Sequence, residues 1–254
     1  MRVAVAGGTG QVGAPVVERL RERGHDVVVL SRSEGVDLTT GAGLADALEG
    51  AEVIVDATST AARDTKSCVE FFSSVARNLQ EAGAAAAVRR IVTLSIVGID
   101  GLDGGGPFAH YAGKLAQEAA TTAGAVPTVI LRASQFHGFP GQMIDWMAKG
   151  PFLPVPKQPV QTVDLDAVVD HLVRLVDADV GSSHELVNLA GPERQLLADL
   201  VRATARARGR RLLVVPVWLP GETARRIREG ALQAPPGAII DGRRFAEVVS
   251  APRT

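Results

Sequence analysis

The chain has 254 residues, 46% of them hydrophobic, and its 27 basic and 28 acidic residues leave a formal net charge of -1. This length suits one large α/β domain, or a nucleotide-binding domain with a small added lobe, and the balanced charge excludes a long-range field for nucleic acid. The mean hydropathy is only +0.14, no apolar run approaches the roughly 20 residues that span a bilayer, and no targeting segment precedes the first strand, so we expect a cytoplasmic protein without a membrane partner.

The first half of the chain alternates short β-branched runs with helix-forming segments. Near-continuous apolar strands separated by helices are typical of a parallel sheet that is covered on both faces, which predicts a doubly wound α/β fold. The expected strands are 2–6, 26–30, 52–56, 90–95 and 128–132, and the expected helices are 11–23, 44–48, 65–82 and 109–123.

The second half of the chain changes in texture near residue 138. Prolines then punctuate a segment that carries Phe139, Met143, Trp146 and Phe152. We interpret this segment either as a mobile apolar wall of a substrate pocket or as filling for irregular gaps in the core. Further elements, a helix at 164–176, a strand at 185–189, a helix at 193–206 and a strand at 212–216, indicate a small C-terminal α/β lobe. The arginines within 202–211 are interpreted as a solvated helix end, where cations suit the helix dipole.

A glycine-rich turn follows the first strand and reads Gly7-Gly8-Thr9-Gly10-Gln11-Val12-Gly13. The glycines permit a tight turn and let the backbone approach a pyrophosphate, while the start of the next helix supplies free amide donors. Because the motif follows an apolar strand and opens an amphipathic helix, it predicts a dinucleotide-binding Rossmann core over residues 1–137. Residues 138–254 are then expected to form mostly a substrate-binding lobe, with segments that can return to the core.

The end of the second expected strand discriminates between NAD and NADP. Proteins that bind NAD typically place a carboxylate here to bond the ribose 2′-hydroxyl, and a carboxylate would repel a 2′-phosphate. In this chain the strand runs into Ser31-Arg32-Ser33. Arginine offers a planar, permanently charged donor fork for a phosphate, and the serines can add hydrogen bonds. The sequence therefore favours NADP(H).

These motifs together resemble the atypical short-chain dehydrogenase/reductases of the NmrA-like type, which include NADPH-dependent reductases and nucleotide sensors without demonstrated turnover. The resemblance covers most of the chain. Beyond the two motifs above, it rests on two expected strand ends: Asp56-Ala57-Thr58, at the end of the fourth strand of the family pattern, and Leu94-Ser95-Ile96-Val97-Gly98, at the end of the fifth. It also rests on Lys114-Leu115-Ala116-Gln117-Glu118 and on Leu131-Arg132-Ala133-Ser134-Gln135-Phe136.

The resemblance also implies which residues contact each part of the cofactor. Thr9, Gln11 and Val12 would contact the pyrophosphate, and Thr58 would lie on the ribose side. Asp37 and Leu38 would contact the adenine. Ser134, Gln135 and Phe136 would lie at the nicotinamide end.

The main departure from the wider superfamily lies at its Tyr-x-x-x-Lys motif. There, the lysine charge lowers the pKa of the phenol and the lysine holds the ribose, while the tyrosine exchanges a proton with the substrate. In this chain the residue four before Lys114 is His110, and Tyr111 is three before it. Since both spacings share one helix face, three alternatives stay open: His110 is the proton donor, Tyr111 is the donor, or neither transfers a proton and Lys114 only binds ribose.

Two further side chains are candidates for the substrate pocket. Ser95 lies where the family often has a hydroxyl that bonds the substrate carbonyl, although a strand-end serine can equally cap its own loop. His137 follows the strand at 128–132 and either faces the pocket or is structural. No metal site is expected, because the five histidines lack a ligand spacing with carboxylates. The lone Cys68 is interpreted as a core residue on a helix face.

The sequence therefore supports one main functional hypothesis and two alternatives. The main one is an NADPH-dependent reductase of a small apolar carbonyl compound or quinone, because a quinone relaxes the need for a strong, positioned acid. The alternative from another class is a non-catalytic regulatory protein that senses NADP(H). A nucleotide-sugar epimerase is disfavoured, since that chemistry usually relies on the intact tyrosine. The apolar helices permit a homodimer.

Overall fold

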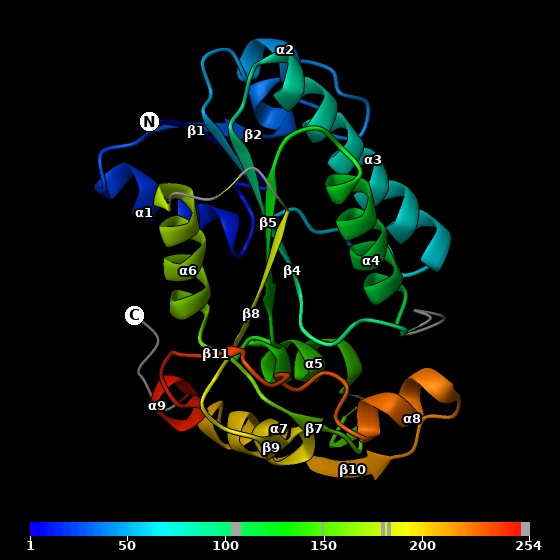
Figure 1. Ribbon diagram of the computed structural model, residues 1–254. Coiled ribbons are helices and arrows are strands. Elements are labelled where there is room, and N and C mark those ends of the chain that lie inside the picture. The colour runs from blue at the N-terminus through cyan, green and yellow to red at the C-terminus, as the bar shows by residue number, and fades with distance from the viewer. Residues whose placement is uncertain (103–107, 149, 179–180, 182–183, 250–254) are drawn as a thin grey trace. The chain divides into compact units, whose positions relative to one another are not determined.

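A seven-stranded parallel sheet is the centre of the computed structural model, which describes residues 1–102, 108–148, 150–178, 181 and 184–249. The strand order is β11-β8-β5-β4-β3-β1-β2 (Figure 1). This confirms the doubly wound fold. The strands are β1 (Arg2–Ala6), β2 (Asp26–Leu30), β3 (Val53–Asp56), β4 (Arg90–Ile96), β5 (Thr128–Ala133), β8 (Glu185–Ala190) and β11 (Ile239–Ile240).

Helices cover both faces of this sheet, α1 and α6 on one side and α3 and α4 on the other (Figure 1). Val16, Val17 and Leu20 of α1 are buried, as the apolar periodicity predicts. Cys68 is buried on α3, which confirms its interpretation as a core residue. The helices around the sheet are α1 (Gly13–Glu22), the 3-10 turn η1 (Arg32–Glu34), α2 (Leu44–Ala47), α3 (Thr65–Ala85), α4 (Ala109–Thr122) and α6 (Leu165–Asp177).

One expectation about the strands is wrong. The sequence pattern counts Asp56 at the end of the fourth strand and Leu94 near the end of the fifth, but the structure ends β3 at Asp56 and places Leu94 in β4. Between β2 and β3 the chain forms η1 and α2 and no further strand. The backbone there turns at Gly35, Gly41 and Gly43, which all have positive φ values. As a result β2 lies at the edge of the sheet.

The chain divides into two compact units, each assembled from three segments. The first unit consists of Met1–Ile96, Asp100–Arg132 and Val169–Val187, and the second of Val97–Ile99, Ala133–Val168 and Asn188–Thr254. None of the helices within the described ranges is both long and apolar enough to cross a membrane.

The second unit has its own apolar core, and the proline-punctuated segment contributes to it. That segment forms α5 and β6, and Met143, Ile144 and Leu153 are buried together with residues of α7. Pro140 is tolerated because it lies in the first turn of α5, where its missing amide hydrogen costs no helical bond. The elements of this unit are α5 (Phe139–Met147), β6 (Phe152–Pro156), β7 (Pro159–Val160), β9 (Gln195–Leu196), α7 (Leu197–Ala207), β10 (Leu213–Val217), α8 (Glu222–Arg228) and α9 (Phe245–Val249).

A buried ion pair in the first unit joins β5 to α4. Arg132 Nε donates to Glu118 Oε1 at 2.9 Å, and its Nη2 donates to Glu118 Oε2 at 2.6 Å. Arg132 also pairs with Asp100, in the segment after β4. Both Arg132 and Glu118 are buried, so each charge depends on the other for its solvation.

We expect Arg132→Met to lower the free energy of unfolding by about 3–5 kcal/mol, because it leaves the Glu118 carboxylate buried without its cation. The double variant Arg132→Met with Glu118→Leu should recover most of this loss, since an apolar pair replaces both charges. Urea denaturation of Arg132→Met, Glu118→Leu and the double variant measures the change in the free energy of unfolding. Equal losses in the single and double variants would contradict a dominant cost of the unpaired charge.

Candidate functional site

The turn between β1 and α1 brings backbone atoms unusually close together. Gly7 has a φ of +75°, and a Cβ there would lie 2.8 Å from the carbonyl oxygen of Ala57. The amide of Gly10 donates to the carbonyl of Gly7 at 2.9 Å. A Cβ at Gly13 would overlap that same Gly7 carbonyl. Only glycine fits at Gly7 and Gly13, which explains the spacing of the motif.

The start of α1 is open to an anion. Val12 is its N-cap residue, and no side chain caps the helix there. Thr9 and Gln11 are exposed on the same turn, while Val12 is buried. Because the amides of the first turn of a helix lack intrahelical partners, this ten-residue helix offers donors and a positive dipole end to a phosphate. The cradle therefore fits a dinucleotide pyrophosphate.

The segment after β2 presents an exposed cation between two hydroxyls. Arg32 begins η1 and forms no ion pair with any residue that the structure describes. The Ser31 and Ser33 hydroxyl oxygens lie 2.8 Å apart. The backbone then reverses at Gly35, whose φ is +79°. Arg32 is thus available to a ligand phosphate.

The two residues expected beside the adenine are already engaged in local contacts. Asp37 Oδ1 accepts hydrogen bonds from the Thr39 amide at 2.8 Å and the Thr39 hydroxyl at 2.6 Å. These bonds hold the pKa of the Asp37 carboxyl below its usual value. The carbonyl of Leu38 accepts from Asn78 Nδ2 at 2.9 Å, and its side chain packs against the core of the first unit. Asn78, on α3, thereby fixes the loop, a role that the sequence motif does not indicate.

A buried polar network joins the ends of β3 and β4 to α4. Asp56 Oδ1 accepts from the Thr58 amide at 3.0 Å and the Thr58 hydroxyl at 2.6 Å, and Asp56 Oδ2 accepts from Gln117 Nε2 at 2.6 Å. Gln117 Oε1 in turn accepts from Lys114 Nζ at 2.9 Å. Lys114 Nζ also donates to the carbonyls of Leu94 at 3.0 Å and Thr58 at 3.2 Å. All three ammonium hydrogens therefore have acceptors within the protein.

Burial lowers the pKa of Lys114 to about 8, although the negative charges of Asp56 and Glu118 oppose the shift. The sequence expectation gave Lys114 a role at the ribose. Here its ammonium lies 4.5 Å from the centre of the Phe72 ring and stabilises the strand ends. Sequence reasoning did not identify Asp56 and Gln117 as its supports. One available signal was the i, i+3 spacing of Lys114 and Gln117, which places both on one helix face.

The two candidate proton donors lie in apolar surroundings. The His110 ring packs edge-on against Phe72, with ring centres 5.2 Å apart, and the Tyr111 ring stacks on Phe108 at 6.1 Å. Burial, and then the charge of Lys114, lower the pKa of His110 to about 4. Burial raises the pKa of Tyr111 to about 12. At neutral pH the imidazole is therefore uncharged and the phenol is protonated.

Several buried polar atoms in each unit lack a hydrogen-bond partner among the described residues. In the first unit, the hydroxyl of Ser95 at the end of β4 is one of them. In the second unit, they include the Ser134 hydroxyl and both amide atoms of Gln135. Leaving a buried polar group unsatisfied costs about 1–3 kcal/mol, so each such group is expected to meet a partner outside the described protein. Each of these groups can exchange a hydrogen bond with a polar ligand.

Two neighbours of Gln135 are held by the backbone and by side chains of the second unit. Phe136 forms an isolated parallel bridge with Val163. His137 Nδ1 lies 2.8 Å from the Thr162 hydroxyl, and its Nε2 lies 3.0 Å from the carbonyl of Arg243. His137 also packs edge-on against Phe245. These contacts agree with the structural interpretation of His137.

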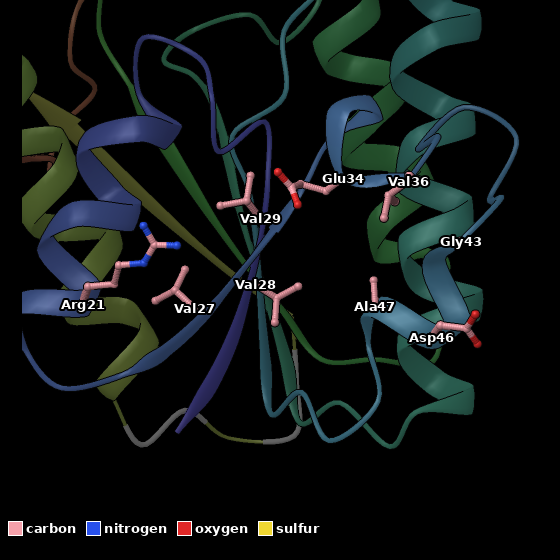
Figure 2. Close-up of a pocket in the computed structure, with 10 residues that line it drawn as sticks. Arg21, Val27, Val28, Val29, Glu34, Val36, Gly43, Asp46 and Ala47 are labelled. Atoms are coloured by element: carbon pink, nitrogen blue, oxygen red, sulfur yellow. The ribbon is translucent and has the colours of Figure 1, made fainter.

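A separate pocket of about 580 Å³ lies along the edge strand β2 (Figure 2). Val27, Val28 and Val29 of β2 line it, and Figure 2 shows Val27 on the side of Arg21 and Val28 on the side of Ala47. None of the glycines at 7–13 and none of the network residues lines it. It lies where β2 forms the edge of the described sheet, and its lining also includes Glu34, Gly35 and Val36, which follow Arg32.

Comparisons with known proteins agree with this geometry. A model of an NAD(P)H-binding family matches residues 7–177. A search among curated proteins gives no match.

Solved structures share the fold at low sequence identity. The dTDP-4-dehydrorhamnose reductase of Bacillus anthracis in complex with NADP is 16% identical, has a TM-score of 0.69, and the match covers 97% of this chain and 92% of that chain. A UDP-galactose 4-epimerase is 19% identical, has a TM-score of 0.70, and the match covers 98% and 96% of the two chains. MoeE5 in complex with UDP-glucose and NAD is 20% identical, has a TM-score of 0.69, and the match covers 100% and 94%. At these identities the likeness establishes the Rossmann-type fold.

We expect Lys114→Ala to lower the free energy of unfolding of the cofactor-free protein by about 2–4 kcal/mol, because the Thr58, Leu94 and Gln117 oxygens lose their donor. Nucleotide affinity should change less than about threefold, since those bonds are internal. Urea denaturation and fluorescence titration measure the two quantities, and the exposed Lys66→Ala is the control. If Lys114→Ala leaves stability unchanged and weakens nucleotide binding more than about tenfold, Lys114 binds the ribose instead.

Proposed function

Since the chain belongs to the NAD(P)H-binding family, we propose that it is an NADPH-dependent reductase that delivers hydride to a small apolar carbonyl compound or a quinone. The observation that carries the proposal is Arg32. It is exposed after β2, beside the hydroxyls of Ser31 and Ser33, and among the described residues it forms no close ion pair, although its charge acts on the Asp37 carboxylate. Within the family we place the protein with the NmrA-like type.

The preference for NADPH follows from charge. An arginine fork can bond a 2′-phosphate through two donors, and each hydrogen bond to a charged group contributes about 1.5–3 kcal/mol. The nearest acid in sequence, Glu34, is exposed on the same 3-10 turn. Its charge reduces the local potential without occupying the guanidinium.

Arg32→Ala should weaken NADPH binding by about 10-fold to 100-fold and leave NADH binding within about threefold, because only NADPH carries the 2′-phosphate. Arg32→Asp should reverse the preference toward NADH. Fluorescence titration with both nucleotides measures the ratio, and Arg77→Ala on α3 is a matched control for the loss of an exposed arginine. Equal weakening of NADPH and NADH binding by Arg32→Ala would rule out a role in reading the phosphate.

The bound nicotinamide supplies the hydride in this proposal, and the protein orients the acceptor and stabilises its developing negative charge. Ser95, whose buried hydroxyl has no described partner, is the donor that we assign to the acceptor oxygen. We assign Ser134, Gln135 and Phe136 to the nicotinamide end, and residues 138–254 to most of the substrate lobe. A quinone suits this set because hydride transfer converts it to a hydroquinone anion whose negative charge is delocalised, and solvent can then deliver the one proton that completes the hydroquinone.

With its pKa near 4, His110 is an imidazolium only in acid, so it cannot serve as a charged donor at neutral pH. We therefore expect kcat/KM to be the same function of pH between pH 5 and 8 in the wild type and in His110→Gln and Tyr111→Phe. Ser95→Ala should lower kcat by about tenfold or more over the whole range. Steady-state oxidation of NADPH with a quinone measures all four proteins. An apparent pKa in this range that disappears in His110→Gln would restore His110 as the acid.

A second function is favoured by the state of Lys114. Its ammonium is saturated by the protein, and neither neighbouring ring titrates near pH 7, which are properties of a binding protein rather than of an acid-base catalyst. The alternative is a regulatory protein that senses NADP(H). A panel of quinones, aldehydes, ketones and nucleotide sugars separates the two. NADPH binding without oxidation by any member supports the sensor, whereas faster turnover of nucleotide sugars would support a sugar-modifying enzyme.

A further inference from the structure

One face of the small β6–β10 sheet in the second unit is largely exposed in the part of the chain that the structure describes. β6 and β10 pair in parallel, with Phe152 beside Leu213 and Pro154 beside Val215. Side chains alternate between the two faces of a strand, and the intervening residue Leu153 is buried in the core of this unit. The outer face therefore consists of six apolar residues, namely Phe152, Pro154, Pro156, Leu213, Val215 and Val217.

This outer face is apolar to an unusual degree for a surface. Phe152 is 54% exposed, Leu213 is 58% exposed and Val215 is 41% exposed. Trp218, directly after β10, is 67% exposed. A contiguous set of exposed apolar side chains usually marks a surface that contacts another apolar phase.

Cations lie at both ends of the outer face. Arg210 and Arg211 precede β10 and are exposed, and neither forms an ion pair with a residue in the described ranges. At the other end, Lys157 follows β6 and places its ammonium 5.3 Å from the centre of the Trp218 ring. The guanidinium of Arg228 lies 4.9 Å from the same ring. The tryptophan thus carries cations on its face and leaves its remaining apolar surface exposed.

The carboxylates of the neighbouring helices do not neutralise this rim. Asp145 of α5 pairs with Arg208, and Glu222 and Glu229 of α8 both pair with Arg225. The rim is therefore cationic in a chain whose formal net charge is -1. Its partner should combine an apolar interior with negative charge around it.

We propose that the outer face of the β6–β10 sheet docks on the surface of an anionic lipid bilayer. Apolar side chains would enter the acyl boundary, Trp218 would lie at the headgroup level, and the cations would contact lipid phosphates. A second copy of this chain fits less well. A two-fold pairing of this face would bring the Arg210–Arg211 end against the Lys157 end, and like charges would meet. The inference does not depend on the proposed reaction.

The test is co-sedimentation of the full chain with vesicles of phosphatidylcholine, with and without phosphatidylglycerol. We expect binding to the anionic vesicles, little binding to the neutral ones, and loss of binding as salt rises. Arg210→Glu with Arg211→Glu, and separately Phe152→Ser with Leu213→Ser, should each weaken binding more than about tenfold. Arg210→Lys with Arg211→Lys should preserve it. The exposed Ile240→Ser, outside this face, is the matched control.

Two results would overturn the proposal. One is the absence of binding to anionic vesicles at low salt, or binding that neither double variant weakens. The other is a dimer in sedimentation velocity that Phe152→Ser with Leu213→Ser converts to a monomer, because the face would then be an interface between copies. Thermal unfolding at the wild-type temperature and unchanged NADPH affinity confirm that the variants are folded.

Discussion

The buried ammonium of Lys114 is the interaction that joins the segment after β3 and the end of β4 to α4 in the first unit. Parallel strands that end side by side leave carbonyl groups pointing past the sheet, and a buried carbonyl needs a donor. Lys114 donates hydrogen bonds to a carbonyl near the end of β4 and to one in the segment after β3. It also donates to Gln117, which in turn donates to Asp56. The Thr58 carbonyl accepts a hydrogen bond from Lys114, and the Thr58 amide and hydroxyl donate to Asp56. One helix thus fixes the backbone beside which the cofactor is expected to lie.

The same arrangement accounts for the unusual acid-base properties of α4. His110 and Tyr111 lie one turn from a buried cation, but neither shares a hydrogen bond with it in the described structure. His110 gains an apolar contact with Phe72 and loses basicity. The three described hydrogen bonds of the Lys114 ammonium go to Thr58, Leu94 and Gln117, and none goes to Tyr111.

Much of the fold could be predicted from the sequence because its signals are local. β1 and β2 begin and end where the apolar runs do, and the glycine spacing is dictated by contacts of Gly7 and Gly13 within one turn. The lysine network could not be predicted in this way, because its members come from β3, β4 and α4. The low pKa of His110 could not be predicted from the sequence either, because it depends on burial of the ring, which packs against Phe72 of α3. The strand β6 could not be predicted, because it contains prolines and is defined by its pairing with β10. The exposed apolar face of the β6–β10 sheet depends on the register of that pairing.

The order in which the chain visits its two units has a consequence for their independence. The segments alternate, so the backbone passes from one unit to the other five times between Met1 and Thr254. No single cut in the chain separates the two units, because neither unit is one continuous stretch. Each unit is completed by contacts between segments that are distant in the chain, and such long-range closures slow folding.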